Sequence, residues 1–437
     1  MKKFIRIDRK IKSFNKKIDV EGDKSLSIRW VIISSLSKKK SVAFNLLKSE
    51  DVISAVNCIR VLGSKVKFIK NRCEIIGNGL NFNNKKKLTL NAGNSGTLGR
   101  LILGLLINSE RSIKLIGDKS LSKRDFSRVT KPLKKFGAKF KGEKNLPLEM
   151  KGLNDPKAIN YFENKGSAQC KTTIMLAALK SDGLTNIKAK KSRNHTELLF
   201  KYLKIPIKIK TGDKKYDFIK IKGIKKIKPL NYKIPGDISS CSFFIVLTLL
   251  TKNSQLLIKN ININPTRTGI IKILAMMGAQ IKFINKRSYK GEKISDILVK
   301  SSKNLNGINC PIYYNSSAID EFLVIFLVAA KSKGVSYFKD LSELNRKESP
   351  RLIWASKILN LMGIKNIRTK SSIKIFGNPD LKLDKKIVIK NFSKDHRVFM
   401  TSVIAALTFG GKWKIHNLDS IKTSFPKFLQ TLKKIKP

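Results

Sequence analysis

The chain has 437 residues, of which 91 are Lys or Arg and 30 are Asp or Glu, giving a formal net charge of +61 at pH 7. This length exceeds what one hydrophobic core supports, so at least two domains are expected. With 41% hydrophobic residues, the composition excludes a disordered chain. The apolar runs at 241–250 and 322–330 reach only about half of the roughly 20 residues that cross a membrane.

The positive charge suits a nucleic-acid partner, but its distribution does not. Lysine greatly outnumbers arginine and is spread evenly along the chain, whereas nucleic-acid readers cluster basic residues and add exposed aromatic groups. A dispersed, solvated surface that also attracts small anions is the favoured interpretation, and no nucleic-acid partner is expected. RNA binding is kept as the alternative function of a different class.

The cysteines are odd in number and lack CxxC spacing, which indicates reduced thiols and neither a disulfide framework nor a zinc site. No apolar signal segment begins the chain, so a cytoplasmic protein is expected. The five cysteines are Cys58, Cys73, Cys170, Cys241 and Cys310.

A polar cluster followed by a strongly apolar run occurs six times along the chain, and it indicates an internal repeat of 70 to 80 residues. Each apolar run predicts a buried helix, and the unit reads as strand, helix, strands, amphipathic helix and strand. Helix starts carry unpaired N–H groups, so the clusters are either N-caps or anion sites. In chain order, the six segments are 22–36, 93–107, 166–179, 236–250, 316–330 and 394–407.

The second helix of most repeats ends in a turn that leads into a strand. Gly63, Gly137, Gly278 and Gly363 stand where such a helix end requires positive φ, while Ile205 breaks the rule in the third repeat. Six repeats give two three-unit domains. We expect residues 22–235 to form the first, and residues 1–21 with 236–437 to form the second.

Six motifs in order along nearly the whole chain resemble 5-enolpyruvylshikimate-3-phosphate (EPSP) synthases, especially bacterial class II members. The motifs are "GDKSLSIR", "GNSGTLGR", "NPTRTG", "RKESPRL", "KDHR" and "TSFP". The resemblance implies an α/β fold of two domains, each with three βαββαβ units in an inside-out α/β barrel, and an active site in the cleft between them. It also implies transfer of the enolpyruvyl group of phosphoenolpyruvate to the 5-hydroxyl of shikimate 3-phosphate through a tetrahedral intermediate. No cofactor and no metal are implied, and a monomer is expected.

The resemblance also implies the site residues, among them seven cations, a residue type suited to binding phosphate and carboxylate. The catalytic candidates are Lys24, Asp320 and Glu348, and the pattern leaves open which carboxylate acts as acid and which as base. Shikimate 3-phosphate is assigned to Lys24, Ser25, Arg29, Ser167, Ala168, Gln169, Arg193, Asp320 and Lys347. Phosphoenolpyruvate is assigned to Lys24, Asn94, Gly96, Arg124, Gln169, Arg351 and Arg397.

The chain departs from the family pattern at Asp125, Pro350 and Thr423, which prompts the alternative of a degenerate, inactive copy. An enolpyruvyl transferase acting on UDP-N-acetylglucosamine is a further rival, but its reactive cysteine is missing from the loop at 117–127. Lys24 is expected to be exposed and not packed. Gly96, where herbicide-tolerant relatives often carry alanine, predicts sensitivity to the family's inhibitor glyphosate.

Overall fold

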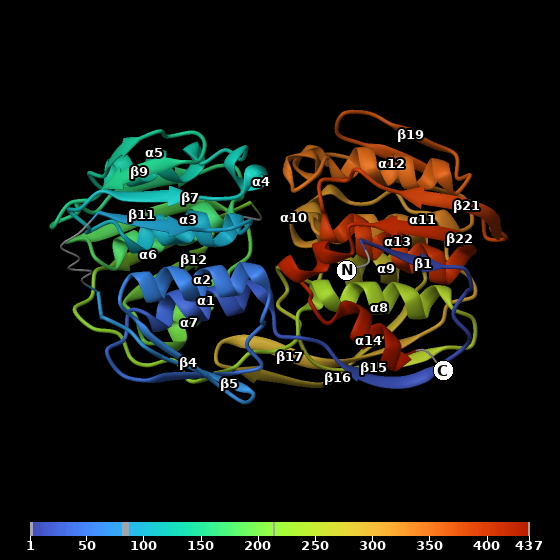
Figure 1. Cartoon of the computed structure of the whole chain (residues 1–437), viewed down its shortest axis with the longest axis horizontal. Coiled ribbons are helices and arrows are strands. Elements are labelled where there is room, and N and C mark those ends of the chain that lie inside the picture. Colours follow the sequence, from blue (N-terminus) through green and yellow to red (C-terminus); the bar gives the residue numbers. More distant parts are fainter. Residues whose placement is uncertain (1–2, 81–86, 213–214, 436–437) are drawn as a thin grey trace. The chain divides into compact units, whose positions relative to one another are not determined.

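The computed structural model describes residues 3–80, 87–212 and 215–435, and the chain divides into two compact units (Figure 1). The predicted mixed α/β class is confirmed. Within the described residues, the strands of each unit form three separate sheets and not one closed barrel. Unit 1 comprises Met1–Glu21, Pro235–Tyr289 and Lys293–Pro437, and unit 2 comprises Gly22–Ile234 and Lys290–Glu292.

The three sheets of unit 2 share one pattern, in which a parallel pair is extended by two antiparallel strands. The first sheet orders β14 (Tyr232–Lys233), β3 (Ser41–Phe44), β5 (Arg72–Ile76) and β4 (Lys65–Ile69). The second orders β6 (Leu88–Asn91), β7 (Ile113–Ile116), β9 (Leu148–Lys151) and β8 (Lys139–Lys141). The third orders β10 (Asn160–Glu163), β11 (Leu184–Lys190), β13 (Tyr216–Lys222) and β12 (Ile207–Thr211).

The helices of unit 2 fall into a buried set and a half-exposed set, as the apolar runs predict. Almost every side chain of the first set is buried, because these helices are apolar nearly all round. The buried set is α1 (Lys24–Ser34), α3 (Gly96–Leu105) and α6 (Ala168–Ala178). The others are α2 (Glu50–Val61), α4 (Lys119–Ser122), α5 (Ser127–Lys135) and α7 (His195–Tyr202).

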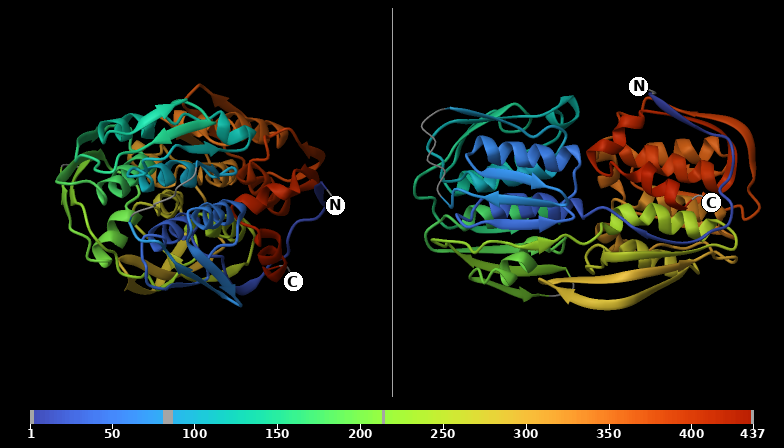
Figure 2. Two further views of the ribbon diagram at one scale, coloured as in Figure 1. Left: turned by 60° about the vertical axis from the view of Figure 1, so that its left-hand side comes forward. Right: turned by 60° about the horizontal axis from the view of Figure 1, so that its bottom comes forward.

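Unit 1 has three sheets as well, and the N-terminal strands belong to two of them. β16 (Gln280–Tyr289) and β17 (Glu292–Lys300) form a long hairpin (Figure 2). Its tip, Lys290–Glu292, belongs to unit 2, and the rest of both strands belongs to unit 1. The first sheet orders β16 (Gln280–Tyr289), β17 (Glu292–Lys300), β15 (Gln255–Asn262) and β2 (Asn15–Asp19). The second orders β18 (Val335–Phe338), β20 (Ile373–Phe376) and β19 (Asn366–Arg368). The third orders β1 (Phe4–Ile7), β22 (Gly410–His416) and β21 (Leu383–Ile389).

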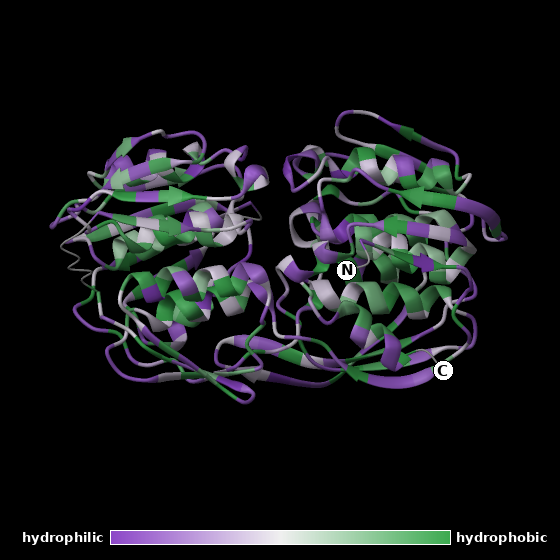
Figure 3. Ribbon diagram, viewed as in Figure 1, coloured by the Kyte–Doolittle hydropathy of each residue, from purple (hydrophilic) through white to green (hydrophobic). Residues whose placement is uncertain are grey.

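The helices of unit 1 repeat the division into buried and half-exposed sets, and Figure 3 shows hydrophobic residues concentrated on the helices and hydrophilic ones on the loops. None of the described helices is long and apolar enough to cross a membrane. The buried helices are α8 (Ile238–Leu250), α11 (Phe322–Lys331) and α13 (His396–Phe409). The others are α9 (Gly269–Met276), α10 (Asn315–Ala318), α12 (Arg351–Leu361) and α14 (Phe428–Ile435), with short 3-10 turns η1 (Ile312–Tyr314), η2 (Ser342–Arg346) and η3 (Leu418–Thr423).

The polar clusters act as N-caps at five of the six buried helices. In each, a side-chain oxygen accepts a hydrogen bond from a backbone N–H of the first turn, which satisfies one of the donors that a helix start leaves open. At α11 the preceding Glu321 makes no such bond. The capping residues are Asp23, Ser95, Ser167, Asp237 and Asp395.

The four predicted turn glycines have positive φ, between 80° and 105°. The expectation for the third repeat was wrong by one residue. Lys204, with φ of 57°, occupies the left-handed position there, and Ile205 follows it as a buried residue. A non-glycine residue accepts this conformation at a modest energetic cost. The repeat is therefore geometrically regular where its sequence is not.

Helices α3 and α6 pack against each other, and Gly104 is the point of closest approach. A Cβ at Gly104 would lie 2.2 Å from the backbone oxygen of Thr173, whereas one at Gly99 meets the end of the Phe126 ring at 3.2 Å. The backbone of Thr173 cannot move aside cheaply, but a ring can turn.

We therefore predict that Gly104→Ala lowers the free energy of unfolding, while Gly99→Ala in the same helix costs less. Both substitutions gain about 1 kcal/mol of helix propensity, so the difference between them isolates the steric effect. Urea denaturation of the two variants measures it. Equal stability of the two proteins would contradict the close approach of the helices.

Candidate functional site

In unit 2, the start of α3 gathers a group of polar side chains around a glycine. Arg124 Nη2 donates to Asn94 Oδ1 at 3.2 Å, and Asn94 Nδ2 donates to Asp118 Oδ2 at 2.6 Å. A Cβ built on Gly96 would lie 2.9 Å from Arg124 Nη1 and 3.1 Å from Arg100 Nη1. The three residues predicted to bind phosphoenolpyruvate in this stretch are thus brought together.

Arg100 connects this group to α6. Its Nη1 donates to Gln169 Oε1 at 2.7 Å, and Gln169 Nε2 donates to Thr97 Oγ1 at 2.9 Å. Burial and the neighbouring Arg124 lower the pKa of Arg100 to about 10, which leaves it protonated at neutral pH. The sequence analysis placed Arg100 in a repeat motif but gave it no role. Its place beside Gln169 was not readable from sequence because the two residues are 69 positions apart.

Lys24 is the first residue of α1 and was expected to be exposed and unpacked. This expectation was wrong, since its side chain is 23% exposed and its Nζ lies 3.0 Å from Asp51 Oδ2. Asp51 is in the first turn of α2 and is itself almost buried. An ammonium group held between two helix starts remains a suitable anion ligand, but its position is set by a partner carboxylate.

Arg29 projects from the middle of α1 and is buried, with 3% of its surface exposed. Its Nε donates to Thr196 Oγ1 at 2.8 Å, its Nη2 to Thr172 Oγ1 at 3.3 Å, and its Nη1 to the Ser25 carbonyl oxygen at 3.1 Å. Arg193 precedes the first turn of α7, which contains Thr196. Three of the residues named here, Ser25, Arg29 and Arg193, were assigned to shikimate 3-phosphate.

The start of α6 carries the third predicted group of unit 2. Ser167 caps the helix, and its backbone N–H donates to Glu163 Oε2 at 3.0 Å. Ala168 is the first helical residue. Burial raises the pKa of Glu163, although hydrogen bonds from the Ser167, Lys165 and Gly166 N–H groups work against the rise. Glu163 thus holds the loop that presents the cap.

In unit 1, Arg351 is surrounded by three carboxylates. Its Nε lies 2.9 Å from Asp395 Oδ2, its Nη1 lies 3.3 Å from Asp320 Oδ1, and its Nη2 pairs with Glu348. Lys347 Nζ also lies 3.0 Å from Asp320 Oδ1. The two predicted catalytic carboxylates are therefore held by one guanidinium, as only a planar five-donor group allows.

The Arg351–Asp395 pair is buried on both sides, with side-chain exposures of 2% and 0%. Burial alone would lower the pKa of Arg351, but the carboxylates of Asp395, Glu348 and Asp320 raise it above its ordinary value. Burial would likewise raise the pKa of Asp395, but the Arg351 guanidinium more than offsets this and holds it below 3.8. The pair is thus ionised at neutral pH. Asp395 belongs to the motif KDHR, but no role was predicted for it.

Arg397, in the first turn of α13, is joined to the start of α8. Its Nη2 donates to Ser239 Oγ at 2.5 Å, and its Nη1 lies 3.9 Å from Glu321 Oε1. Ser239 Oγ also donates to Glu321, which is buried. Glu321 makes no side-chain cap bond at the start of α11 and instead takes part in this ion pair. Ser239 belongs to a predicted polar cluster but was not singled out.

The three departures from the family pattern have local explanations. Asp125 Oδ1 accepts a hydrogen bond from Ser127 N at 2.8 Å, just before α5 begins at Ser127. Pro350 immediately precedes α12, where a missing N–H costs little, and Ser349 Oγ donates to Asp395 Oδ2 at 2.9 Å. Thr423 Oγ1 donates to the Ser420 carbonyl oxygen at 2.9 Å. Each residue is accommodated without disturbing the contacts above.

The histidines near the predicted site are both buried. His195 Nδ1 lies 2.6 Å from Glu292 Oε1, and both side chains are fully buried. His396 lies 3.4 Å from Thr423 Oγ1 through its Nδ1. Among residues 3–80, 87–212 and 215–435, no three His, Cys, Asp or Glu side chains gather as a metal-binding group.

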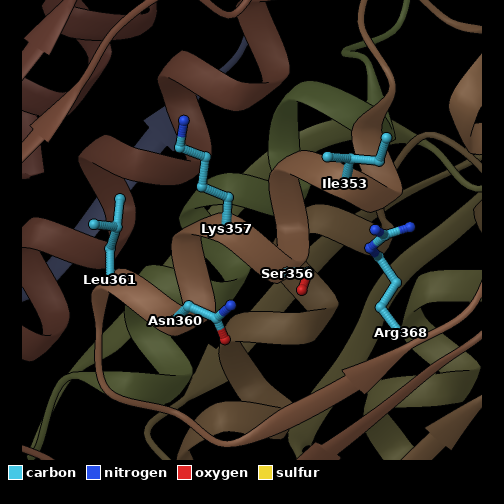
Figure 4. A pocket seen from close by; sticks show the side chains of 6 residues that line it. All are labelled: Ile353, Ser356, Lys357, Asn360, Leu361 and Arg368. Atoms are coloured by element: carbon cyan, nitrogen blue, oxygen red, sulfur yellow. The ribbon is translucent and has the colours of Figure 1, made fainter.

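A hollow of about 360 Å³ lies over the outer face of α12 (Figure 4). It is lined by Ile353, Ser356, Lys357, Asn360, Leu361 and Arg368, and by none of the residues predicted to bind substrate. Five of these side chains belong to α12 and follow one face of the helix at intervals of three and four residues. We assign the hollow no part in the predicted site.

We predict that Asp395→Ala lowers the free energy of unfolding by about 3 kcal/mol or more, because it leaves Arg351 buried without its closest partner. Asp419→Ala, which removes an exposed pair with Lys394, should cost less than about 1 kcal/mol. Urea denaturation at pH 7 compares the two. A similar small cost for both would contradict the importance of the buried pair.

The contribution of the Arg351–Asp395 pair to the free energy of unfolding depends on pH. Because the pKa of Asp395 is lower in the folded protein than its ordinary value of 3.8, its contribution to stability is complete at neutral pH and is lost as the pH falls below about 4. The stability difference between Asp395→Ala and the unmodified protein should therefore shrink in acid.

The chain is similar in sequence and in structure to known proteins. The sequence model of a family described as EPSP synthase (3-phosphoshikimate 1-carboxyvinyltransferase) matches residues 9–432. A 3-phosphoshikimate 1-carboxyvinyltransferase from Petrotoga mobilis is 37% identical over 97% of this chain and 98% of its own length. An EPSP synthase structure from Acinetobacter baumannii has a TM-score of 0.86 and 32% identity over 99% of this chain and 98% of that one. The enolpyruvyl transferase NikO from Streptomyces tendae, at 12% identity and a TM-score of 0.77 over 99% and 97%, shares the fold.

Proposed function

The chain belongs to the EPSP synthase family, and we propose that it transfers the enolpyruvyl group of phosphoenolpyruvate to the 5-hydroxyl of shikimate 3-phosphate. The products are 5-enolpyruvylshikimate 3-phosphate and inorganic phosphate. In the first step, the 5-hydroxyl adds to C2 of phosphoenolpyruvate while C3 gains a proton. In the second, the tetrahedral intermediate expels phosphate and loses a proton from C3, which restores the double bond.

The observation that carries the proposal is the group around Arg351. Asp320 and Glu348, the two carboxylates that the family resemblance assigns to proton transfer, lie on the same guanidinium. A cation between them fixes their positions. One can accept a proton from the 5-hydroxyl while the other serves C3, and general acid or base groups of this kind contribute about 10²–10⁴-fold each.

The substrates together carry two phosphates and two carboxylates, and the site must offer several cations. We propose that Lys24, Arg124, Arg351 and Arg397 bind phosphoenolpyruvate, with Asn94, Gly96 and Gln169 beside them. Arg351 would exchange part of its contact with the carboxylates for substrate. For shikimate 3-phosphate we propose the cations Lys24, Arg29, Arg193 and Lys347, with Ser25, Ser167, Ala168, Gln169 and Asp320 as neutral and acidic contacts.

The decisive experiment measures phosphate release from phosphoenolpyruvate in the presence and absence of shikimate 3-phosphate. We expect release only with both substrates. Release of phosphate without shikimate 3-phosphate would indicate a different acceptor or simple hydrolysis. Binding of both substrates without phosphate release would indicate a degenerate, inactive copy, the alternative suggested by Asp125, Pro350 and Thr423. Binding of single-stranded RNA without turnover would favour the alternative raised by the net charge.

We predict that Lys24→Met reduces kcat at least about a hundredfold while the protein stays folded, because the variant loses the ammonium charge but keeps a similar side-chain length. Lys67→Met, at an exposed position of β4, is the matched control and should keep full activity. Steady-state kinetics and a circular-dichroism melt distinguish the cases. Unfolding of the Lys24 variant, or retained turnover, would show that Lys24 is structural.

We predict that glyphosate inhibits the unmodified enzyme in competition with phosphoenolpyruvate, and that Gly96→Ala weakens this inhibition at least about tenfold. A methyl group at Gly96 would press on the guanidinium groups of Arg124 and Arg100 and narrow the space for the longer ligand more than for the shorter one. The test compares the inhibition constant with the KM for phosphoenolpyruvate. Equal increases in both constants would contradict this place for Gly96.

The remaining expectations concern the oligomeric state, the cellular location and the absence of a cofactor. We propose a monomer that works without a cofactor. We also propose that it works in the cytoplasm, which the five free, buried cysteines support. Burial raises the pKa of Cys58, Cys73 and Cys170 to about 12, so these thiols are unreactive at neutral pH. Sedimentation analysis tests the oligomeric state, and titration with a thiol reagent before and after unfolding tests the cysteines.

A further inference from the structure

The first turn of α7 is held by three consecutive buried polar side chains. His195, Thr196 and Glu197 are 0%, 1% and 3% exposed. His195 pairs with Glu292, and Glu197 Oε1 lies 2.5 Å from the Nζ of Lys171, which is fully buried in α6. Burying three polar residues in a row is costly unless each has a partner, so this turn is held in one position.

Thr196, the middle residue, is part of a hydroxyl pair that contacts Arg29. Its Oγ1 lies 2.8 Å from Thr172 Oγ1, so one hydroxyl donates to the other. Arg29 Nε donates to Thr196 Oγ1 at 2.8 Å, and Arg29 Nη2 donates to Thr172 Oγ1 at 3.3 Å. Nε and Nη2 form one edge of the guanidinium fork, and the two hydroxyls therefore bind that edge together.

Hydroxyl partners fix a guanidinium without cancelling its charge. A carboxylate at either position would also orient Arg29, but it would compete with an anionic substrate for the same cation. Threonine supplies a neutral acceptor, and its branched side chain has few rotamers in a helix. The contacts come from α6 and α7 and meet α1, so the orientation of Arg29 depends on three helices at once.

We propose that Thr196 is a positioning residue for the binding of shikimate 3-phosphate, acting through Arg29. It orients the guanidinium toward an anionic group of this substrate and does not touch the reacting atoms. The inference rests on the proposed function. It adds a residue that none of the sequence motifs assigned to substrate, and it gives a reason for the burial of Arg29.

The test uses Thr196→Val, which keeps the shape of the side chain and removes the hydroxyl, and Thr196→Ser, which restores it. We expect Thr196→Val to raise the KM for shikimate 3-phosphate roughly tenfold, with kcat and the KM for phosphoenolpyruvate changed less than about twofold. Thr196→Ser should return the KM to near the original value. Thr130→Val, in which another buried threonine of unit 2 loses a hydrogen bond to the Glu143 carbonyl oxygen, should lower stability without changing either KM.

A double-mutant cycle with Arg29→Lys shows whether Thr196 acts through Arg29. If it does, adding Thr196→Val to Arg29→Lys should not raise the KM for shikimate 3-phosphate further. Additive effects, or a Thr196→Val variant with an unchanged KM, would overturn the positioning role while leaving the proposed function intact. If the unmodified protein neither binds nor turns over shikimate 3-phosphate, the proposed function fails, and the positioning role fails with it.

Discussion

The buried ion pair between Arg351 and Asp395 is the constraint on which the chemistry of unit 1 depends. Asp395 caps α13 through the Arg397 N–H, accepts the hydroxyl of Ser349, and binds the guanidinium of Arg351. Arg351 in turn holds Asp320 and Glu348. Buried charges are tolerated only when they are paired and hydrogen-bonded, and this requirement locks three separate chain segments into one geometry.

In unit 2, the arginines near the start of α3 are held in position by neutral partners. Arg100 and Arg124 lie near Gly96, and the glycine leaves room for their guanidinium groups at the start of α3. Gln169 and Asn94 bind them through amide oxygens. Amide and hydroxyl groups orient cations without neutralising them, which keeps positive charge in place for anionic substrates. In unit 1, by contrast, the arginine is paired with carboxylates. This difference fits a reaction in which one set of residues binds anions and another moves protons.

The repeat explains why these residues meet at helix starts. Each buried helix is mostly apolar along its length, and its N-terminal end needs a cap for the N–H groups that have no partner within the helix. The caps are supplied by Ser and Asp, and the neighbouring positions are then free to carry cations such as Lys24 and Arg397. The cations at these helix starts are explained by anionic substrates, and they do not require a nucleic-acid partner.

The sequence by itself determined the α/β class and the repeated buried helices, because period and composition act locally. It left open whether the polar clusters cap these helices or bind anions, and the structure shows five of them as caps. It also pointed to Asp320, Glu348 and Arg351 through motifs. It missed Arg100, Asp395 and Ser239 as partners, placed the left-handed turn of the third repeat on Ile205 and not on Lys204, and described Lys24 as unpacked. Those points were decided by tertiary structure alone, because each depends on residues that are distant in the chain or on backbone geometry that a neighbouring element imposes.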